Sequence, residues 1–383
     1  MFFTASAQIR LNTLGFFPNQ PKRASIAAAC TNFSVVRLDN SVAFKGPVGP
    51  ALSNPDTSET ICVADFSQCR EVGTFELEVP GVGRSAPFQI SSNVYGNAFY
   101  LVTRGFYLWR CGTAVAYTNN GKIFAHDACH TNDAWLDFVT GEHVMTNSTK
   151  GWHDAGDYNK YVVNAGVTLG VLFRAWEDFG GSIKKVRLDL PEAGGVLPEF
   201  LSEMKWEVDW LLTMQAPDGS VYHKVSTERF GPFVAPEKEQ TPRYFSPWSS
   251  AATADFVAVM AMAARDFRPY EPAYADECLH AAEKSYAFLL AHPEDHQADL
   301  SHFTTGPYQI RDSDVRIWAA AELWETTGQS NYLHDFEKRI SQVDRPVDLR
   351  WDYGNVKNLG TITYLFSKRD GRNASTVEML RTK

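Results

Sequence analysis

The chain has 383 residues, of which 44% are hydrophobic and 21% are charged, and its formal net charge is -9. This length provides two or three domains with enough apolar residues for a large core. The acidic balance, without a run of Lys and Arg, argues against nucleic acid and anionic membrane surfaces as partners, and no apolar run reaches the length of a membrane span.

The first residues have the pattern of the end of an export signal. Ala5-Ser6-Ala7 is the small-x-small arrangement that precedes signal cleavage, but residues 1–8 lack the length and the basic segment of a complete signal. We therefore expect a secreted or periplasmic protein whose signal peptide is missing from this sequence. A cytoplasmic location is the alternative.

Residues 8–92 have the pattern of short β-strands. Strand-forming residues recur in runs at 8–11, 23–28, 33–38, 74–79 and 86–90, and turn-forming Gly, Pro and Asn separate them. Short strands at this spacing predict a β-sandwich domain. Because no carboxylate cluster with catalytic spacing falls within it, we expect this domain to have a structural role.

From residue 98 onward the apolar residues recur with helical periodicity. They lie near positions i, i+3, i+4 and i+7 in the segments 98–110, 163–179, 198–215, 249–266, 272–292, 313–327 and 332–340. Pro198 suits a first helical position, whereas Gly180-Gly181 and Gly328 follow predicted helix ends. A series of helices with no strand between them predicts an all-α second domain over 98–383.

The segment 151–163 carries two carboxylates, Asp154 and Asp157, with Gly156 between them. We expect Gly156 to let the backbone turn so that both side chains point at one spot. Two convergent carboxylates can hold a water molecule and remove its proton. The alternative is a solvated turn, because Asp and Gly are common turn residues. Aromatic faces on which a pyranose ring can stack flank the pair, and these are Trp152, Tyr158 and Tyr161.

The whole segment resembles the signature of glycoside hydrolase family 9, the inverting cellulases, whose core reads Gly-Trp-x-Asp-Ala-Gly-Asp-Tyr-x-Lys-Tyr. Residues 246–261 and 318–328 extend the resemblance. It implies an immunoglobulin-like module over 8–92 and an (α/α)6 barrel over 98–383. It also implies inverting hydrolysis of β-1,4-glucosidic bonds in cellulose or related β-glucans, with Asp154 and Asp157 activating water as the general base.

The family's general acid is a late glutamate that follows a His/Arg loop, and the end of this chain matches neither. We therefore expect a barrel that is incomplete at the C-terminus and whose activity is in doubt. Glu199, Glu203 and Glu207 recur at helical spacing, which favours a solvated helix face over a substitute acid, and Glu192 is a further candidate. The alternatives are a non-catalytic carbohydrate-binding remnant and an exo-acting β-glucosaminidase.

Two cysteines and two histidines form a candidate metal site. Two thiolates and two imidazoles make a tetrahedral zinc set with no open position, which is the structural kind. Spacing alone leaves ordinary loop histidines as the alternative. The resemblance implies a structural zinc that would fix one end of the loop carrying Asp154, and its ligands would be Cys111, Cys129, His130 and His153. Calcium is a second candidate, without assigned ligands.

Three further residues are candidate sugar contacts because they lie in predicted loops around the helices. His223 follows one predicted helix, and Tyr244 and Trp248 precede the next. Each offers a ring or a polar tip to a glucosyl unit, and packing in the interior is the alternative for each. We expect a monomer whose partner is a β-glucan polysaccharide or oligosaccharide.

Overall fold

The computed structural model describes residues 8–350 and 352–382. The chain divides into two compact units, residues 1–102 and 103–383, and helix α1 (Gly96–Leu108) crosses the division. Ala5-Ser6-Ala7 lies outside the described residues. Within the described part, no helix has both the length and the apolar character needed to span a bilayer.

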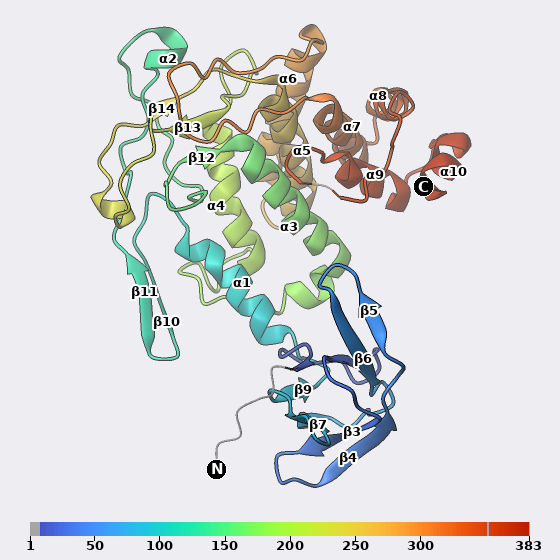
Figure 1. The fold of residues 1–383 in the computed structure, drawn as a ribbon. Coiled ribbons are helices and arrows are strands. Elements are labelled where there is room, and N and C mark those ends of the chain that lie inside the picture. The colour runs from blue at the N-terminus through green and yellow to red at the C-terminus, as the bar shows by residue number, and fades with distance from the viewer. Residues whose placement is uncertain (1–7, 351, 383) are drawn as a thin grey trace. The chain divides into compact units, whose positions relative to one another are not determined.

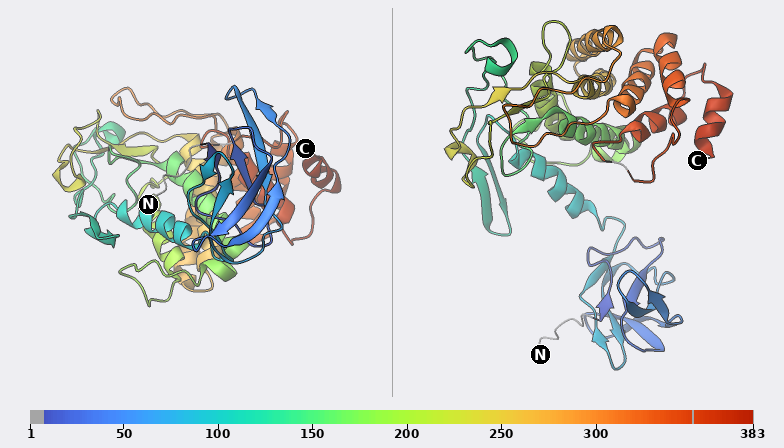
Figure 2. Two further views of the ribbon diagram at one scale, coloured as in Figure 1. Left: turned by 60° about the horizontal axis from the view of Figure 1, so that its bottom comes forward. Right: turned by 45° about the horizontal axis from the view of Figure 1, so that its top comes forward.

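The first unit is a sandwich of two antiparallel sheets (Figures 1 and 2). One sheet has the order β1-β2-β6-β5 and the other β4-β3-β7-β8, with β9 also paired to β7. The strands are β1 Ile9–Arg10, β2 Arg23–Ile26, β3 Asn32–Arg37, β4 Val42–Pro47, β5 Leu52–Asn54, β6 Glu59–Asp65, β7 Gly73–Val79, β8 Gly83–Arg84 and β9 Phe88–Ile90. The predicted β-sandwich is confirmed.

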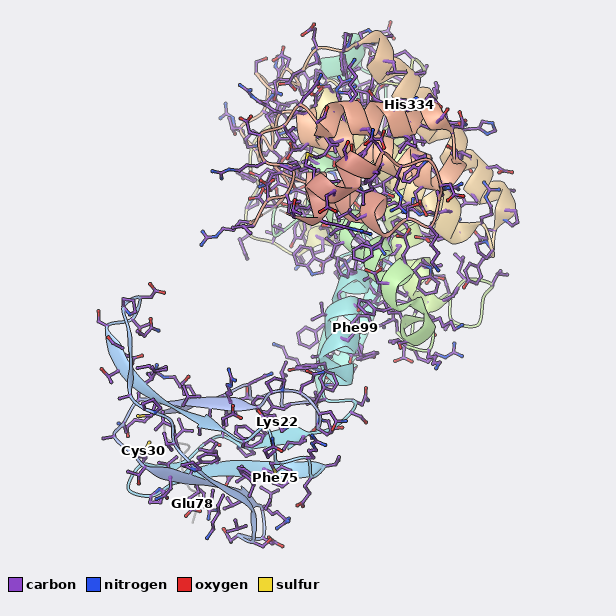
Figure 3. The ribbon with its side chains drawn as sticks, turned by 90° about the vertical axis from the view of Figure 1, so that its right-hand side faces the viewer. Lys22, Cys30, Phe75, Glu78, Phe99 and His334 are labelled. Atoms are coloured by element: carbon purple, nitrogen blue, oxygen red, sulfur yellow. The ribbon has the colours of Figure 1, made fainter. Side chains whose placement is uncertain are left out.

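The alternation of side chains along the strands builds the sandwich core. In β7, Phe75, Leu77 and Val79 are buried, while Glu76 and Glu78 lie on the other face. Figure 3 labels Phe75 and Glu78 in this strand. Strands β4, β5, β6 and β8 were not predicted. Strands β4 and β5 lie at sheet edges and bury no side chain fully, and β8 has only two residues, whereas β6 does alternate and buries Cys62 and Ala64.

The second unit is a succession of antiparallel helix pairs (Figure 2, right). Its helices after α1 are α2 Asp137–Thr140, α3 Val162–Ile183, α4 Glu199–Thr213, α5 Ser250–Phe267, α6 Pro272–Ala291, α7 Ser313–Thr327, α8 Ser330–Ile340, α9 Lys357–Phe366 and α10 Ala374–Arg381. Neighbours α3, α5, α7 and α9 pack in series, and α4, α6, α8 and α10 pack against them from outside. This is the arrangement predicted for an α/α barrel.

The inner helices approach one another closely because they carry small residues. Every residue of α5 except Arg265 is buried, as expected for a helix enclosed by others. One predicted helix end is wrong: α3 continues through Gly180-Gly181 to Ile183, and the backbone N–H of Lys184 still donates to the carbonyl oxygen of Gly180 (3.0 Å). Gly328 does end α7, with a left-handed φ of 73°.

The expectation of no strands between the helices is also wrong. A hairpin of β10 (Val115–Asn119) and β11 (Lys122–His126) turns at Asn120-Gly121, both with positive φ. A small antiparallel sheet has the order β12-β13-β14, with bounds Lys160–Tyr161, Lys224–Ser226 and Tyr244–Phe245. The strands β12 to β14, of two or three residues, are too short to show a period, whereas the five-residue strands β10 and β11 around Asn120-Gly121 carry a hairpin signal in the sequence.

The packing of α3 against α7 can be tested at Gly170. A Cβ atom there would lie 2.6 Å from the buried Trp318 ring, whereas one at Gly181 in the same helix would meet nothing within 4 Å. We expect Gly170→Ala to lower the free energy of unfolding by about 1–3 kcal/mol. Gly181→Ala should raise it by roughly 0.5 kcal/mol through the greater helix propensity of Ala. Urea denaturation measures both, and equal effects would contradict this packing.

Candidate active site

Backbone hydrogen bonds hold the start of the loop 151–159 against the segment that follows α1. Gly151 accepts a hydrogen bond from the backbone of Cys111 (2.7 Å), and His153 donates to Trp109 (2.8 Å). Gly156 and Asp157 lie in a turn, so the backbone does bend between the two carboxylates, although Gly156 has no positive φ. A positive φ occurs instead at Gly151 (77°) and Tyr158 (57°), near the two ends of the loop.

The two carboxylates face a common group of tyrosines and asparagines. Asp157 accepts hydrogen bonds on Oδ2 from the Tyr161 hydroxyl (2.7 Å) and the Asn159 amide (3.0 Å). Asp154 accepts one on Oδ1 from Asn164 (2.7 Å). Among the described residues, Oδ1 of Asp157 is buried and has no hydrogen-bond partner. That oxygen therefore has free lone pairs beside the second carboxylate.

The electrostatics also indicate that the two carboxylates are close. Burial, and then the charge of Asp157, raises the pKa of Asp154, while the hydrogen bond from Asn164 lowers it. Burial and the charge of Asp157 raise the pKa of Tyr161, to which Asp154 also contributes. The ring of Tyr308, whose hydroxyl lies 3.4 Å from Asp154 Oδ2, is 4.7 Å from that of Tyr161. The structure thus places the two predicted carboxylates close to each other.

The expectation of a solvated face for the glutamates of α4 is wrong, because all three are buried, Glu203 and Glu207 beneath the loop and Glu199 against the segment at Leu188. Glu203 pairs with Arg110 (3.0 Å) and accepts from the Trp152 indole (2.9 Å). Glu207 accepts from the Trp152 backbone, and burial raises the pKa of Glu207 to about 8. Glu199 accepts from the backbone of Leu188 (2.7 Å). The spacing of the glutamates was read correctly, but spacing does not tell which face of a helix is covered.

The aromatic residues of the loop are mostly interior. Trp152 is 7% exposed and packs against Phe106, with ring centroids 4.6 Å apart, and Tyr161 is 3% exposed. Neither therefore offers an open face to a sugar, and only Tyr158 of the three is half-buried. Beside the loop, Tyr158 and Gly156 line a cavity of about 530 Å³ that also involves Trp109, Phe124 and His126.

The four predicted metal ligands lie together behind the loop. Each offers one donor atom, and these atoms lie within 4.8 Å of one another: Cys111, Cys129, His130 and His153. Burial lowers the pKa of His153, which favours its neutral, ligating form. Burial alone would raise the pKa of Cys111, but the Cys129 hydrogen bond and the charges of Lys160 and Arg243 lower it overall.

This cluster fits a tetrahedral metal ion. Two sulfurs and two neutral imidazoles are the donor set that zinc prefers in closed structural sites. Nδ1 of His130 is buried without a hydrogen-bond partner among the described residues, and Sγ of Cys129 lies 3.5 Å from Nε2 of His153. An ion would satisfy donor atoms that the surrounding protein leaves unpaired.

Arg243 connects this cluster to the loop, and sequence reasoning missed it. Its buried guanidinium pairs with Asp133, donates to the carbonyl oxygen of Tyr158 and lies 3.4 Å from Sγ of Cys111. No local signal could have identified the residue, because Arg243 and Cys111 are 132 positions apart.

The three candidate sugar contacts lie in different environments. His223 is 1% exposed, and its ring nitrogens contact Ser249 Oγ (2.9 Å) and the carbonyl oxygen of Pro307 (2.7 Å). Both nitrogens are therefore occupied by protein. Tyr244 is half-buried on β14, and Trp248 is half-buried and stacks on His296, with ring centroids 3.8 Å apart. Only Tyr244 and Trp248 keep surface that a ligand can reach.

Comparison with known proteins agrees with this architecture. Residues 4–84 match the cellulase N-terminal ig-like domain. Over 378 residues the chain is 52% identical to endoglucanase D of Acetivibrio thermocellus, covering 98% of this chain and 60% of that protein. The chain thus spans about three-fifths of the length of this curated relative.

Two solved structures have the same fold. A Bacteroides ovatus GH9 protein superposes with a TM-score of 0.89 at 30% identity, covering 98% of this chain and 71% of the other. A Zn-binding triple mutant of the GH family 9 endoglucanase J30 superposes with a TM-score of 0.86 at 33% identity, covering 96% and 70%. Residues 95–381 match glycosyl hydrolase family 9, and the chain belongs to that family.

Proposed function

We propose that this protein hydrolyses β-1,4-glucosidic bonds of cellulose or related β-glucans with inversion, using Asp154 and Asp157 to activate water. The observation that carries the proposal is the buried Oδ1 of Asp157, which has no hydrogen-bond partner in the described part of the chain and lies near a second carboxylate. The similarity to an endoglucanase supports the substrate class.

The hydrogen bonds suggest how the two carboxylates divide the work. Asp157 keeps Oδ1 free while Tyr161 and Asn159 fix Oδ2, so Asp157 takes the proton from water. Asp154 is held by Asn164 and orients the same water through its other oxygen. The hydroxide that forms attacks the anomeric carbon from the face opposite the leaving oxygen, the bond between that carbon and the leaving oxygen breaks as an acid protonates the oxygen, and the configuration is inverted.

The acid that protonates the leaving oxygen is not assigned to the glutamates considered from the sequence. Glu199, Glu203 and Glu207 are buried in structural hydrogen bonds and ion pairs, and Glu192 pairs with Arg110 (2.9 Å). A glutamate committed to a permanent partner is poorly placed to donate a proton to a sugar oxygen.

We also propose that Cys111, Cys129, His130 and His153 hold a structural zinc ion. When bound, zinc would cross-link the segment after α1 to the loop, without an open position for a substrate. His153 adjoins Asp154 and donates its backbone N–H to Trp109, so the cross-link would restrict the base of the loop. Calcium has no assigned ligands, and export and a monomeric state remain predictions.

The roles of the carboxylates are tested by replacement with the isosteric amide. We expect Asp157→Asn and Asp154→Asn each to lower kcat by about 10²–10⁴-fold, because an amide at 157 cannot take the proton of water and one at 154 loses the charged acceptor that orients it. Release of reducing ends from carboxymethyl cellulose and from chitosan oligomers measures activity and substrate class. The exposed Asp370→Asn variant should keep full activity. Tight binding without turnover by the parent protein would favour a non-catalytic role.

The pH dependence follows from the environment of Asp154. This carboxylate must be ionised to accept from water, and its pKa is raised, so activity should be lost at a higher pH than for an ordinary aspartate. Asn164→Ala removes a hydrogen bond that lowers this pKa, so the acid limb should move to still higher pH. Profiles of kcat/KM against pH measure the shift, with the exposed Asn331→Ala as control. An acid limb that does not move would exclude Asp154 from the rate-determining ionisation.

The metal proposal has a readout that does not depend on activity. The parent should contain about one zinc per chain, whereas Cys129→Ser and His130→Ala should contain much less and melt at lower temperature. Cys278→Ser is the matched control, because Cys278 is also a buried thiol but lies outside the cluster. Elemental analysis after dialysis measures the metal. Equal zinc content in all four proteins would show that the ion binds elsewhere.

A further inference from the structure

The buried aromatic residues of the loop provide no open ring on which a sugar could stack. Trp152 and Tyr161 are buried, although a β-linked glucosyl unit has apolar C–H faces that normally contact an open aromatic ring. Phe233 is the opposite case, since its side chain is 100% exposed. An apolar ring that packs against no core contributes little to folding, so its position is informative.

Phe233 lies over the bend between the two carboxylates. A Cβ atom built on Gly156 would be 3.5 Å from both Cε2 and Cζ of the Phe233 ring. Gly156 is itself exposed. It directly precedes Asp157, and Ala155 lies between it and Asp154. The ring therefore stands on the solvent side of the loop, beside Gly156, the residue that directly precedes Asp157.

The segment that carries Phe233 is attached to the loop at several points. The Tyr158 hydroxyl donates to the carbonyl oxygen of Val234, the residue that follows Phe233. At the start of the same connection between β13 and β14, Thr227 donates its backbone N–H to Asn159 Oδ1 (3.0 Å). At its end, Arg243 donates to the Tyr158 carbonyl. These bonds fix the connection to the residues that directly follow Asp157.

We propose that Phe233 is a stacking platform for one glucosyl unit of a β-1,4-glucan next to the bond that is cleaved. The occupant is a neutral, equatorially substituted pyranose, because the ring offers only an apolar face and no polar atom. Phe233 is a specificity-determining residue and takes no part in proton transfer. The proposal rests on the proposed function, since it places the sugar at Asp154 and Asp157.

Kinetics with cellohexaose test the platform. Phe233→Ala should raise KM about 3- to 10-fold, the size expected for losing one aromatic stacking contact, with kcat within twofold of the parent. Phe233→Tyr and Phe233→Trp should restore the parent KM, because each supplies a flat ring. The melting temperature should be unchanged in all variants, since the side chain is fully exposed. Phe366→Ala, which removes another exposed ring (72%) on α9, should change neither constant.

A binding measurement separates failure of this inference from failure of the proposed function. Isothermal titration of cellohexaose into Asp157→Asn and into Asp157→Asn/Phe233→Ala should show 3- to 10-fold weaker binding by the double variant. Weaker binding alongside a parent that does not hydrolyse the sugar supports the platform and overturns the hydrolase. A Phe233→Ala enzyme with parental KM and parental affinity overturns the platform alone. Absence of both binding and hydrolysis in the parent overturns both.

Discussion

The buried guanidinium of Arg243 holds together the parts from which the site is built. It pairs with Asp133, donates to the carbonyl oxygen of Tyr158 and approaches the sulfur of Cys111. Removing a partner from a buried charge costs several kcal/mol, so the segments that supply these partners are restricted to one relative arrangement. Tyr158 keeps its left-handed φ of 57° within that arrangement. The direction of the preceding carboxylate, Asp157, depends on it.

The two faces of the loop 151–159 carry different groups. On the inner face, His153 joins the cysteine and histidine cluster, and Trp152 is held by Glu203 and Glu207. On the outer face, Asp154 and Asp157 stand beside solvent-accessible residues. Burial keeps the inner groups neutral or paired, whereas hydrogen bonds from neighbouring side chains hold the outer carboxylates in place. A rigid support with a half-buried carboxylate pair in front suits repeated proton transfer from water.

The glutamates of α4 and the aromatic residues show that a sequence pattern does not reveal whether its residues are buried. Glu199, Glu203 and Glu207 have the spacing of a solvated helix face, yet each is buried because Arg110, the Trp152 backbone and the segment at Leu188 supply partners for their oxygens. Polar residues at helical spacing mark one face of the helix and carry no information about what covers it. The aromatic residues behave likewise, because Trp152 packs inside whereas Phe233 stays in solvent.

The amino-acid sequence by itself indicated the two-part architecture, five strands of the sandwich and seven of the helices, and it singled out the carboxylate pair and the four metal-ligand candidates. The strands and helices follow from local periodicity and the carboxylate pair from the chemistry of neighbouring residues, whereas the four metal-ligand candidates follow from the resemblance to glycoside hydrolase family 9. Only the tertiary structure decided that Glu203 and Glu207 are buried beneath the loop, that Gly151 and Tyr158 have a positive φ, and that Arg243 and Phe233 lie beside the loop. The reason is physical: burial and hydrogen bonding depend on residues far apart in the chain, and no local pattern records which of them will meet.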